Sequence, residues 1–268
     1  MGGIFHKSGL ISETALADLS LVIITLNEAE NLPALLDSVP KNVEIIVLDS
    51  GSTDQTCQIA NKFGARVEHR AFDNFASQKN YAMSLASRRW TLCLDADELP
   101  DEHLWQAITA AVSGESHEAS AFSMKRRLIF LGRKMRYGRT QDHVVRLFQS
   151  HSASYQNEVH ETIVLPKGSS VLSLDGVLWH KSYKDLDDYF SKFNRYTSMM
   201  AVSRWKSGKS RPSVFLMAAR LPTDFIIRYL FKLGFLDGWQ GFLWAAISSF
   251  YSLIKYAKLK EISEKVSG

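Results

Sequence analysis

The length, composition and charge of the chain set the first limits. It has 268 residues, of which 46% are hydrophobic and 22% charged. A chain of this kind can bury a sizeable core, which excludes an intrinsically disordered protein. The net charge of +4 is small, and we expect no nucleic-acid partner.

The amino-terminal residues and the cysteines bear on location. Residues 1–18 look like a loose leader, without the basic and apolar regions of a signal peptide. Cys57 and Cys93 fall in a predicted helix and a predicted core strand. Two such thiols form neither a disulfide framework nor a metal motif, so we expect both to be reduced and buried. The sequence therefore predicts a cytoplasmic protein.

Strands and helices alternate over residues 19–101. Apolar runs predict strands at Leu19–Thr25, Val43–Leu48 and Trp90–Leu94, and Arg66–Arg70 is expected to form a short strand between the last two. Helices are expected over Ala29–Ser38, from a cap at Ser52 or Thr53 to Phe63, and over Ala76–Ser87. This alternation predicts an α/β fold, an open and mostly parallel sheet flanked by helices. In such sheets ligands bind beyond the carboxyl ends of the strands.

Three polar and acidic tips follow these strands, at Asn27-Glu28, Asp49 to Asp54 and Asp95 to Glu98. Asp95 and Asp97 lie two residues apart, so an extended chain points both to one face. Two such carboxylates favour a divalent cation, because Mg²⁺ takes carboxylates together with substrate phosphates. The alternative is a solvated strand end. Glycine-rich dinucleotide and P-loop motifs are absent, which excludes those nucleotide sites.

The pattern changes over residues 102–183, which we expect to form the second half of the same domain. A helix is predicted over Glu102–Val112, and short strands at Ala121–Ile129, His143–Gln149, Val159–Leu165 and Val171–Leu178. Together they read as a mixed, partly antiparallel half. The basic loop Gly132 to Thr140 either approaches a diphosphate or anionic acceptor, or is a solvated turn.

Residues 184–268 are expected to form a helical extension. Helices are predicted at Lys184–Lys206, Val214–Leu221, Phe225–Leu236 and Phe242–Lys258, and basic residues interrupt the last three before they reach a membrane-spanning length. Ten basic residues and two acids lie between Ala201 and Lys260. This composition favours helices that lie in the interface of an anionic membrane. An intramolecular cover, or a re-entrant or dimer-forming helix at Gly241–Ile254, remains an alternative.

The three tips resemble a known family. Thr25-Leu26-Asn27-Glu28, Asp49-Ser50-Gly51-Ser52-Thr53-Asp54 and Asp95-Ala96-Asp97 are similar to the nucleotide-sugar half of family 2 glycosyltransferases with the GT-A fold, most of all to lipopolysaccharide-core β-1,4-glucosyltransferase-like members. The resemblance implies that Glu28 and Asp49 contact the uridine, that Asp95 lies near the ribose and metal, and that Asp97 ligates the metal. It also implies that residues 102–183 form the acceptor-side half of the catalytic domain.

The donor-binding residues expected from this resemblance are Thr25, Asn27, Glu28, Asp49, Ser52, Asp54, Lys79 and Asp95. Lys79 stands where such enzymes contact the sugar nucleotide, but it also suits a solvated helix lysine. His180 closes a strand that resembles the family's metal-binding strand, which makes it the third expected metal ligand with Asp95 and Asp97. A satisfied core histidine is the alternative.

Two further segments resemble the family and supply candidates for the catalytic base. They are Asp142 with Arg146-Leu147-Phe148, and Val159-His160-Glu161. Inverting transfer needs a carboxylate within reach of the acceptor hydroxyl. We favour Glu161 over Asp142, because a carboxylate in an apolar strand run is hard to explain structurally, whereas Asp142 also suits a turn.

Together these features predict a metal-dependent, inverting enzyme that uses Mg²⁺ or Mn²⁺ and a UDP-sugar. The glutamine of the processive Gln-x-x-Arg-Trp motif is missing before Arg204-Trp205, which favours addition of a single sugar. The expected reaction moves a hexose, glucose from UDP-glucose, to a lipopolysaccharide-core or other membrane-anchored glycolipid, at the cytoplasmic face of the inner membrane. The alternatives are a polyprenyl phosphate or peptide acceptor, and a membrane-surface binding module without turnover. The oligomeric state is left open.

Overall fold

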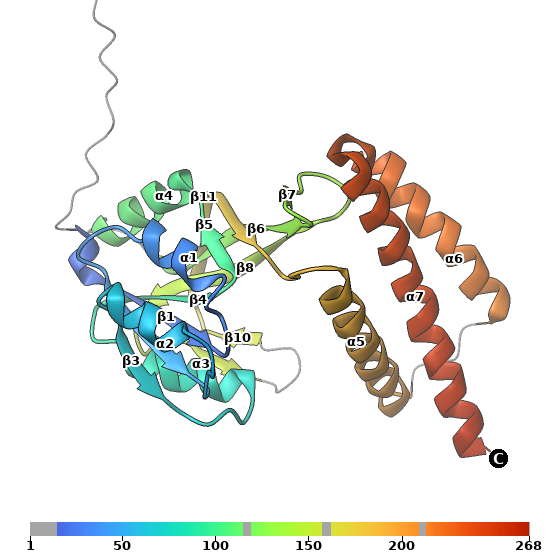
Figure 1. The fold of residues 1–268 in the computed structure, drawn as a ribbon, viewed down its shortest axis with the longest axis horizontal. Coiled ribbons are helices and arrows are strands. Elements are labelled where there is room, and N and C mark those ends of the chain that lie inside the picture. The colour runs from blue at the N-terminus through green and yellow to red at the C-terminus, as the bar shows by residue number, and fades with distance from the viewer. Residues whose placement is uncertain (1–14, 115–118, 157–161, 209–212, 268) are drawn as a thin grey trace, which may run out of the picture. The chain divides into compact units, whose positions relative to one another are not determined.

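The computed structural model describes residues 15–114, 119–156, 162–208 and 213–267, which form two compact units (Figure 1). The sheet unit consists of the described residues of Met1–Arg126 and Asp142–His180. The helical unit consists of those of Arg127–Gln141 and Lys181–Gly268. Residues 127–141, which the sequence places in the acceptor-side half, therefore pack with the carboxyl-terminal helices.

The sheet unit is organised around a sheet in the order β3-β2-β1-β4-β8-β6-β11-β5 (Figure 1). Its parallel strands are β1 (Leu19–Thr25), β2 (Glu44–Asp49), β3 (Arg66–His69) and β4 (Trp90–Asp95). The others are β5 (Glu98–Pro100), β6 (Ala119–Phe130), β8 (Gln141–Gln149) and β11 (Ser170–His180). β8 runs antiparallel to β4, and β5 to β11. The predicted open α/β sheet with a mixed second half is confirmed.

A separate antiparallel pair joins β9 (Ser154–Gln156) to β10 (Thr162–Val164). β10 is the described end of the predicted strand Val159–Leu165. The sequence does not predict β5, β7 or β9, each of which has only two or three residues. Runs this short carry too little periodicity to be recognised.

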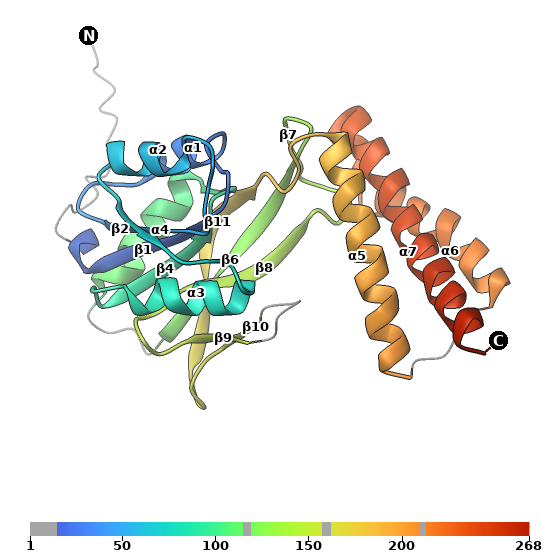
Figure 2. The ribbon, with the colours of Figure 1, turned by 60° about the horizontal axis from the view of Figure 1, so that its bottom comes forward.

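Helices cover both faces of the sheet: α1 (Leu32–Ser38), α2 (Thr56–Lys62), α3 (Phe75–Ser84) and α4 (Glu102–Ser113). Figure 2 shows α3 on the opposite face from α1 and α2. Side chains that alternate along β1 accordingly enter different cores: Leu21 packs with α1 and α4, and Val22 with α3. Leu16, in the predicted leader, is fully buried in the first core.

Two helices begin later than their sequence predicts. α1 starts at Leu32, and α2 starts at Thr56 without a side-chain cap from Ser52 or Thr53. These two residues instead bond within the strand tips, where Ser52 contacts Asp49 and Thr53 contacts Asn27. The loops that follow β1 and β2 are therefore longer than expected.

β11 is fixed to α4 by close backbone packing. Asp101 caps α4 by accepting from the backbone N–H of Leu104, and it also accepts from that of Val177 on β11. Gly176 has φ +99°, and a Cβ built there would lie 2.4 Å from the Leu104 nitrogen. Only glycine allows this approach. The contact fixes the strand that ends at His180.

The helical unit contains α5 (Leu186–Lys206), α6 (Val214–Ile226), a π-helical turn η2 (Ile227–Phe231), a 3₁₀ turn η3 (Gly234–Asp237) and α7 (Gly238–Ser267). The predicted helix Phe225–Leu236 is confirmed only to Phe231, because the chain then turns at Leu233, which has positive φ. β7 (Arg133–Lys134) pairs with the end of β6. Phe130 and Met135 pack against Tyr189 and Ile247.

None of the helices in the described part of the chain is long and apolar enough to cross a membrane.

Candidate active site

The carboxyl ends of β1, β2 and β4 meet at one edge of the sheet. Thr25 lies beside Asp49 in the β1–β2 pairing, and Ile24 lies beside Asp95 in the β1–β4 pairing. The three polar tips therefore converge, as the sequence predicts for parallel strands.

Asp49 is fixed at the centre of the first two tips. Its carboxylate accepts from the Thr25 hydroxyl at 3.1 Å, from the Ser52 hydroxyl at 2.5 Å, and from the backbone N–H groups of Gly51 and Ser52 at 2.9 and 2.8 Å. Burial alone would raise the pKa of Asp49, but these hydrogen bonds outweigh it and lower the pKa. The residue is a rigid anion.

Three of the expected donor-binding residues join the loops to each other. The backbone N–H of Asn27 donates to the Ser52 hydroxyl at 2.8 Å, and the Asn27 side chain accepts from the backbone N–H of Thr53. The Asp54 carboxylate accepts from the backbone N–H of Ala29 at 3.1 Å and also from Thr56. Asn27, Ser52 and Asp54 thus shape the site through these contacts.

Glu28 lies in the same pair of loops. Its backbone N–H donates to the Thr56 hydroxyl at 2.8 Å, and its carboxylate accepts from the Asn31 side chain at 2.8 Å. Its position is therefore set by the amino-terminal ends of α1 and α2.

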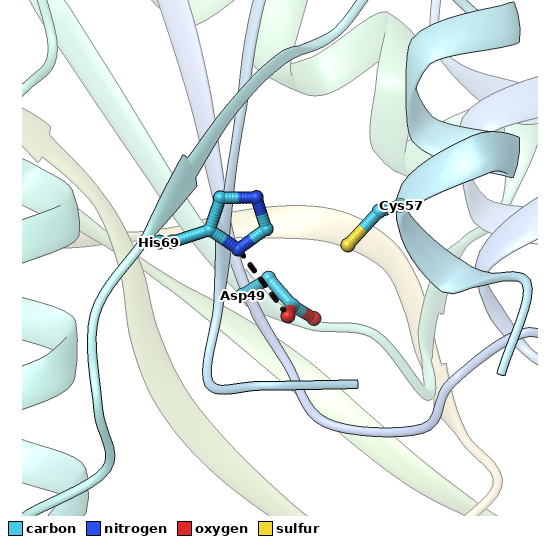
Figure 3. A group of neighbouring side chains, drawn as sticks. All are labelled: Asp49, Cys57 and His69. Carbon is cyan, nitrogen blue, oxygen red and sulfur yellow. Dashed lines mark ion pairs between the residues drawn. The ribbon is translucent and has the colours of Figure 1, made fainter. Parts of the chain in front are cut away.

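Asp49, Cys57 and His69 form a cluster whose ligand atoms lie within 4.8 Å of one another (Figure 3). Sulfur, imidazole and carboxylate are zinc-ligand types. However, a carboxylate has about four lone-pair sites, and the four hydrogen bonds of Asp49 already use them. Burial and the charge of Asp49 also raise the pKa of the Cys57 thiol, which disfavours the thiolate. The donor set here fits a divalent cation poorly.

Asp97 and His180 form a second, better placed pair. The β5–β11 pairing aligns Glu98 with His180 and brings the histidine next to Asp97, with 3.3 Å between Nε2 and the carboxylate. Both side chains remain about one-fifth exposed (23% and 22%). Burial by itself would lower the pKa of His180, but the hydrogen bond and charge of Asp97 raise it. The structure thus unites two of the three predicted metal ligands.

Asp95 faces different partners. Its carboxylate contacts the Lys79 ammonium at 2.9 Å and the Arg146 guanidinium at 2.9 Å. Burial would raise its pKa, but the two cations overcome burial and hold the pKa well below its usual range. Lys79 is buried and also lies over the Tyr155 ring, so its interpretation as a solvated lysine is wrong.

A network of buried charges continues from Arg146 to the neighbouring strands. Arg146 donates to the fully buried Glu98 at 2.7 Å, and Arg126 donates to the same carboxylate at 2.9 Å. Burial would raise the pKa of Glu98, but Arg146 and other cations lower it. Burying charge in this way costs free energy unless every ion is paired.

Asp142 ends this network on β8. Arg126 binds it through two nitrogens, at 3.1 and 2.7 Å. The expectation that Asp142 is a turn residue is wrong, because it lies inside a strand and has a defined ion-pair partner. Burial would raise its pKa, whereas Arg126 lowers it. Glu161 and His160 lie outside the described residues.

Sequence reasoning did not assign roles to Glu98 and Arg126, and it named Arg146 only as part of a motif. The signal for Glu98 was the acidic run Asp95-Ala96-Asp97-Glu98, since three carboxylates so close need cations nearby. No local pattern indicated which arginines would supply them. The identity of these arginines depends on the order of strands β4, β8 and β6 in the sheet, because β8 carries Arg146 and β6 carries Arg126.

Comparisons with known proteins show the family of the chain. A family model described as glycosyl transferase family 2 matches residues 20–165. The chain belongs to glycosyltransferase family 2. An uncharacterized glycosyltransferase of Rickettsia felis is 30% identical over 91% of this chain and 89% of its own length. The lipopolysaccharide core biosynthesis glycosyltransferase LpsC of Rhizobium meliloti is 29% identical over 90% of this chain and 91% of its own.

A solved structure completes these comparisons. Glucosyl-3-phosphoglycerate synthase of Mycobacterium tuberculosis, determined with Mn²⁺, UDP-glucose and phosphoglyceric acid, is 25% identical over 47% of this chain and 49% of that one, with a TM-score of 0.37. Within family 2, the LpsC similarity spans 90% of this chain and therefore reaches into the helical unit. The family model ends at residue 165.

Proposed function

We propose that this family 2 glycosyltransferase is a metal-dependent, inverting hexosyltransferase. Its donor is UDP-glucose, and its acceptor is a lipopolysaccharide-core or other glycolipid at a membrane surface. The observation that carries the proposal is the pairing of Asp97 with His180 at the sheet edge where the tips of β1, β2 and β4 meet.

The residues present suit a divalent cation at Asp97 and His180. One carboxylate oxygen and one imidazole nitrogen lie 3.3 Å apart, and both side chains are partly open to solvent. Oxygen-rich sites with imidazole accept Mg²⁺ or Mn²⁺. A cation bound there supplies Lewis-acid stabilisation to the leaving diphosphate. Asp95, two residues before Asp97, is held by ion pairs with Lys79 and Arg146.

The chain's own residues would hold the donor. Thr25 and Asp49 form the rigid polar surface for the nucleoside, and Asn27 and Ser52 keep the loops in register. The ammonium of Lys79 and the guanidinium of Arg146 add positive charge beside the ribose position implied for Asp95. Preorganised groups of this kind need little rearrangement when charge develops in the transition state.

The base is proposed to be Glu161, which would accept the proton of the acceptor hydroxyl while that oxygen attacks the anomeric carbon. Asp142 is the second candidate. Because Arg126 binds its carboxylate through two nitrogens and lowers its pKa, Asp142 is a weaker base than an unpaired carboxylate.

The acceptor proposal rests on the relative and on charge. LpsC, whose name assigns it to lipopolysaccharide core biosynthesis, is similar over 90% of this chain. The excess of basic residues between Ala201 and Lys260 suits an anionic glycolipid. The proposed place of action is the cytoplasmic face of the inner membrane.

A thermal-shift panel tests the donor. Nucleotides and UDP-, GDP- and CDP-sugars are each added with and without Mn²⁺, and ligands that bind only the folded protein raise the melting temperature. We expect a metal-dependent rise with UDP and UDP-glucose. A rise in melting temperature with a different sugar nucleotide would identify that nucleotide as the donor instead. No rise with any of them would contradict the proposal.

The variant Asp97→Asn tests the metal site. We expect the rates of UDP-glucose hydrolysis and of sugar transfer to fall by about 10²-fold or more, because removing one group that stabilises charge in the transition state has an effect of this size. The metal-dependent thermal shift should disappear as well. Asp37→Asn, an exposed carboxylate on α1, is the matched control and should retain both. Wild-type activity in Asp97→Asn would remove the metal site from the proposal.

A further inference from the structure

The turn between α6 and α7 packs against the loop that follows β7 within the helical unit. The Asp237 carboxylate accepts from the backbone N–H groups of Arg136 at 3.0 Å and Tyr137 at 2.8 Å. The backbone N–H of Gly138 donates to the carbonyl of Lys232 at 2.9 Å. Residues 131–139 and 226–242 thus form one folded feature, which we call the tip.

The tip exposes an unusual amount of apolar surface. Phe231 is 75% exposed and Trp239 is 62% exposed. The other large exposed apolar residues of the tip are Tyr137, Ile226, Leu230, Leu233, Phe235, Leu236 and Phe242. Single exposed apolar side chains are common, but a concentration of aromatic and leucine side chains in two short segments indicates an interaction surface.

The charge of the tip has one sign. Its exposed basic residues are Arg133, Lys134, Arg136, Arg139 and Lys232. Its single acidic residue, Asp237, is buried and accepts the two backbone hydrogen bonds described above. Both segments lie entirely within the described residues, and they present no exposed carboxylate to a partner. The surface that remains is apolar and cationic.

We propose that the tip docks the enzyme on an anionic membrane, with Phe231 and Trp239 entering the interface. Phe, Trp and Leu side chains flanked by Lys and Arg are typical of segments that lie in the headgroup region. Aromatic rings settle at that depth, and each basic residue adds attraction to anionic lipids. The long basic side chains can remain with the headgroups while their neighbours enter the apolar layer.

A second copy of the chain is a poorer occupant. A two-fold interface would place the same patch on both subunits, so the five exposed cations of one tip would face those of the other. Like charges across an interface disfavour association. An anionic lipid surface satisfies both the apolar and the cationic character of the tip.

The inference deepens the proposed function, because it names the surface on which a membrane-held acceptor would be met. The two can fail separately. Vesicle binding is measured without donor or metal, whereas UDP-glucose hydrolysis is measured without vesicles. A negative result in one of these assays therefore leaves the result of the other interpretable.

The experiment is co-sedimentation of the full chain with vesicles of phosphatidylcholine alone or with phosphatidylglycerol added. We expect binding only to the anionic vesicles, weakened by salt because the attraction is screened. The double variant Phe231→Ser, Trp239→Ser should bind ~10-fold more weakly. Phe215→Ser is the matched control, since Phe215 is exposed in the first turn of α6 and lies outside the tip.

Charge is tested separately by Lys232→Gln with Arg136→Gln, which should reduce binding and its dependence on salt. Circular dichroism and light scattering accompany each variant. Anionic-vesicle binding that is absent in the wild type, or unchanged in the Phe231 and Trp239 variant, would overturn the docking surface. A wild-type dimer that this variant converts to monomer, with vesicle binding retained, would assign the tip to a second copy instead.

Discussion

The two units use polar and apolar residues in opposite ways. The sheet unit buries charge: Glu98 is fully enclosed and is held by Arg126 and Arg146. The helical unit exposes apolar side chains, among them Phe215 and Phe231. Each departs from the usual distribution of residue types. In the sheet unit the carboxylates Asp95 and Glu98 have described cations, whereas the ring of Phe231 in the tip is 75% exposed.

The two units therefore meet different physical requirements, one for fixed charges and one for exposed apolar surface. Buried ion pairs contribute little net stability, but they hold charged groups in fixed positions. Exposed aromatic residues contribute little to folding, and their placement has value for binding. Substitutions in the first region should therefore affect stability or catalysis strongly, and substitutions in the second should affect neither.

The largest effect is expected from Glu161→Gln. As the proposed base, it should lower kcat for transfer by about 10³-fold while the melting temperature stays near that of the wild type. Asp142→Asn should lower kcat less and reduce stability, because it leaves Arg126 without one of its carboxylates. Steady-state transfer assays and thermal melts distinguish the two. The reverse order of kcat would make Asp142 the base.

Arg146→Met should destabilise the fold by about 3–5 kcal/mol, because removing one partner of a buried pair leaves an uncompensated charge. The carboxylates affected are Asp95 and Glu98. Lys265→Met, which breaks an exposed pair with Glu261 on α7, should cost far less, because solvent screens the pair. Urea unfolding of both variants measures the contrast. Equal losses in the free energy of unfolding of the two variants would contradict this prediction, because Asp95 and Glu98 would then not depend on Arg146.

Stability should fall in acid more steeply than exposed carboxylates alone would cause. The folded-state pKa of Glu98 lies below its ordinary value of 4.5, so the folded protein binds this proton less readily than the unfolded chain. Its contribution is complete above that value and is lost as the pH falls through the lower, folded-state pKa. Urea midpoints from about pH 6 to about pH 3 measure the loss. Glu98→Gln should flatten this dependence, and an unchanged slope would contradict the assignment.

The smallest effect is expected from Phe231→Ala. Its ring is mostly exposed, so the free energy of unfolding should change by about 0.5 kcal/mol or less. Phe148→Ala, which removes a fully buried ring from β8, should cost about 3–5 kcal/mol. Denaturant melts compare the two. A large loss in Phe231→Ala would show that the tip serves folding rather than docking.

The sequence alone was sufficient for the framework of the sheet unit. Apolar runs predicted β1, β2 and β4 to within a residue or two, because strands buried on both faces need such runs. The short edge strand β3, which is not apolar, was also predicted to within a residue. The same parallel topology predicted that the tips of β1, β2 and β4 would meet. The motifs at those tips also indicated family 2, which the family match confirms.

Only the tertiary structure decided which groups pair at the site. Lys79 is bound to Asp95 rather than solvated, and Asp97 rather than Asp95 faces His180. These pairings depend on α3 packing against β4 and on β5 pairing with β11. Likewise, residues 127–141 joined the helical unit through contacts with distant helices. Local patterns set the elements, but the partner of a charge or an apolar ring is set by segments far away in the chain.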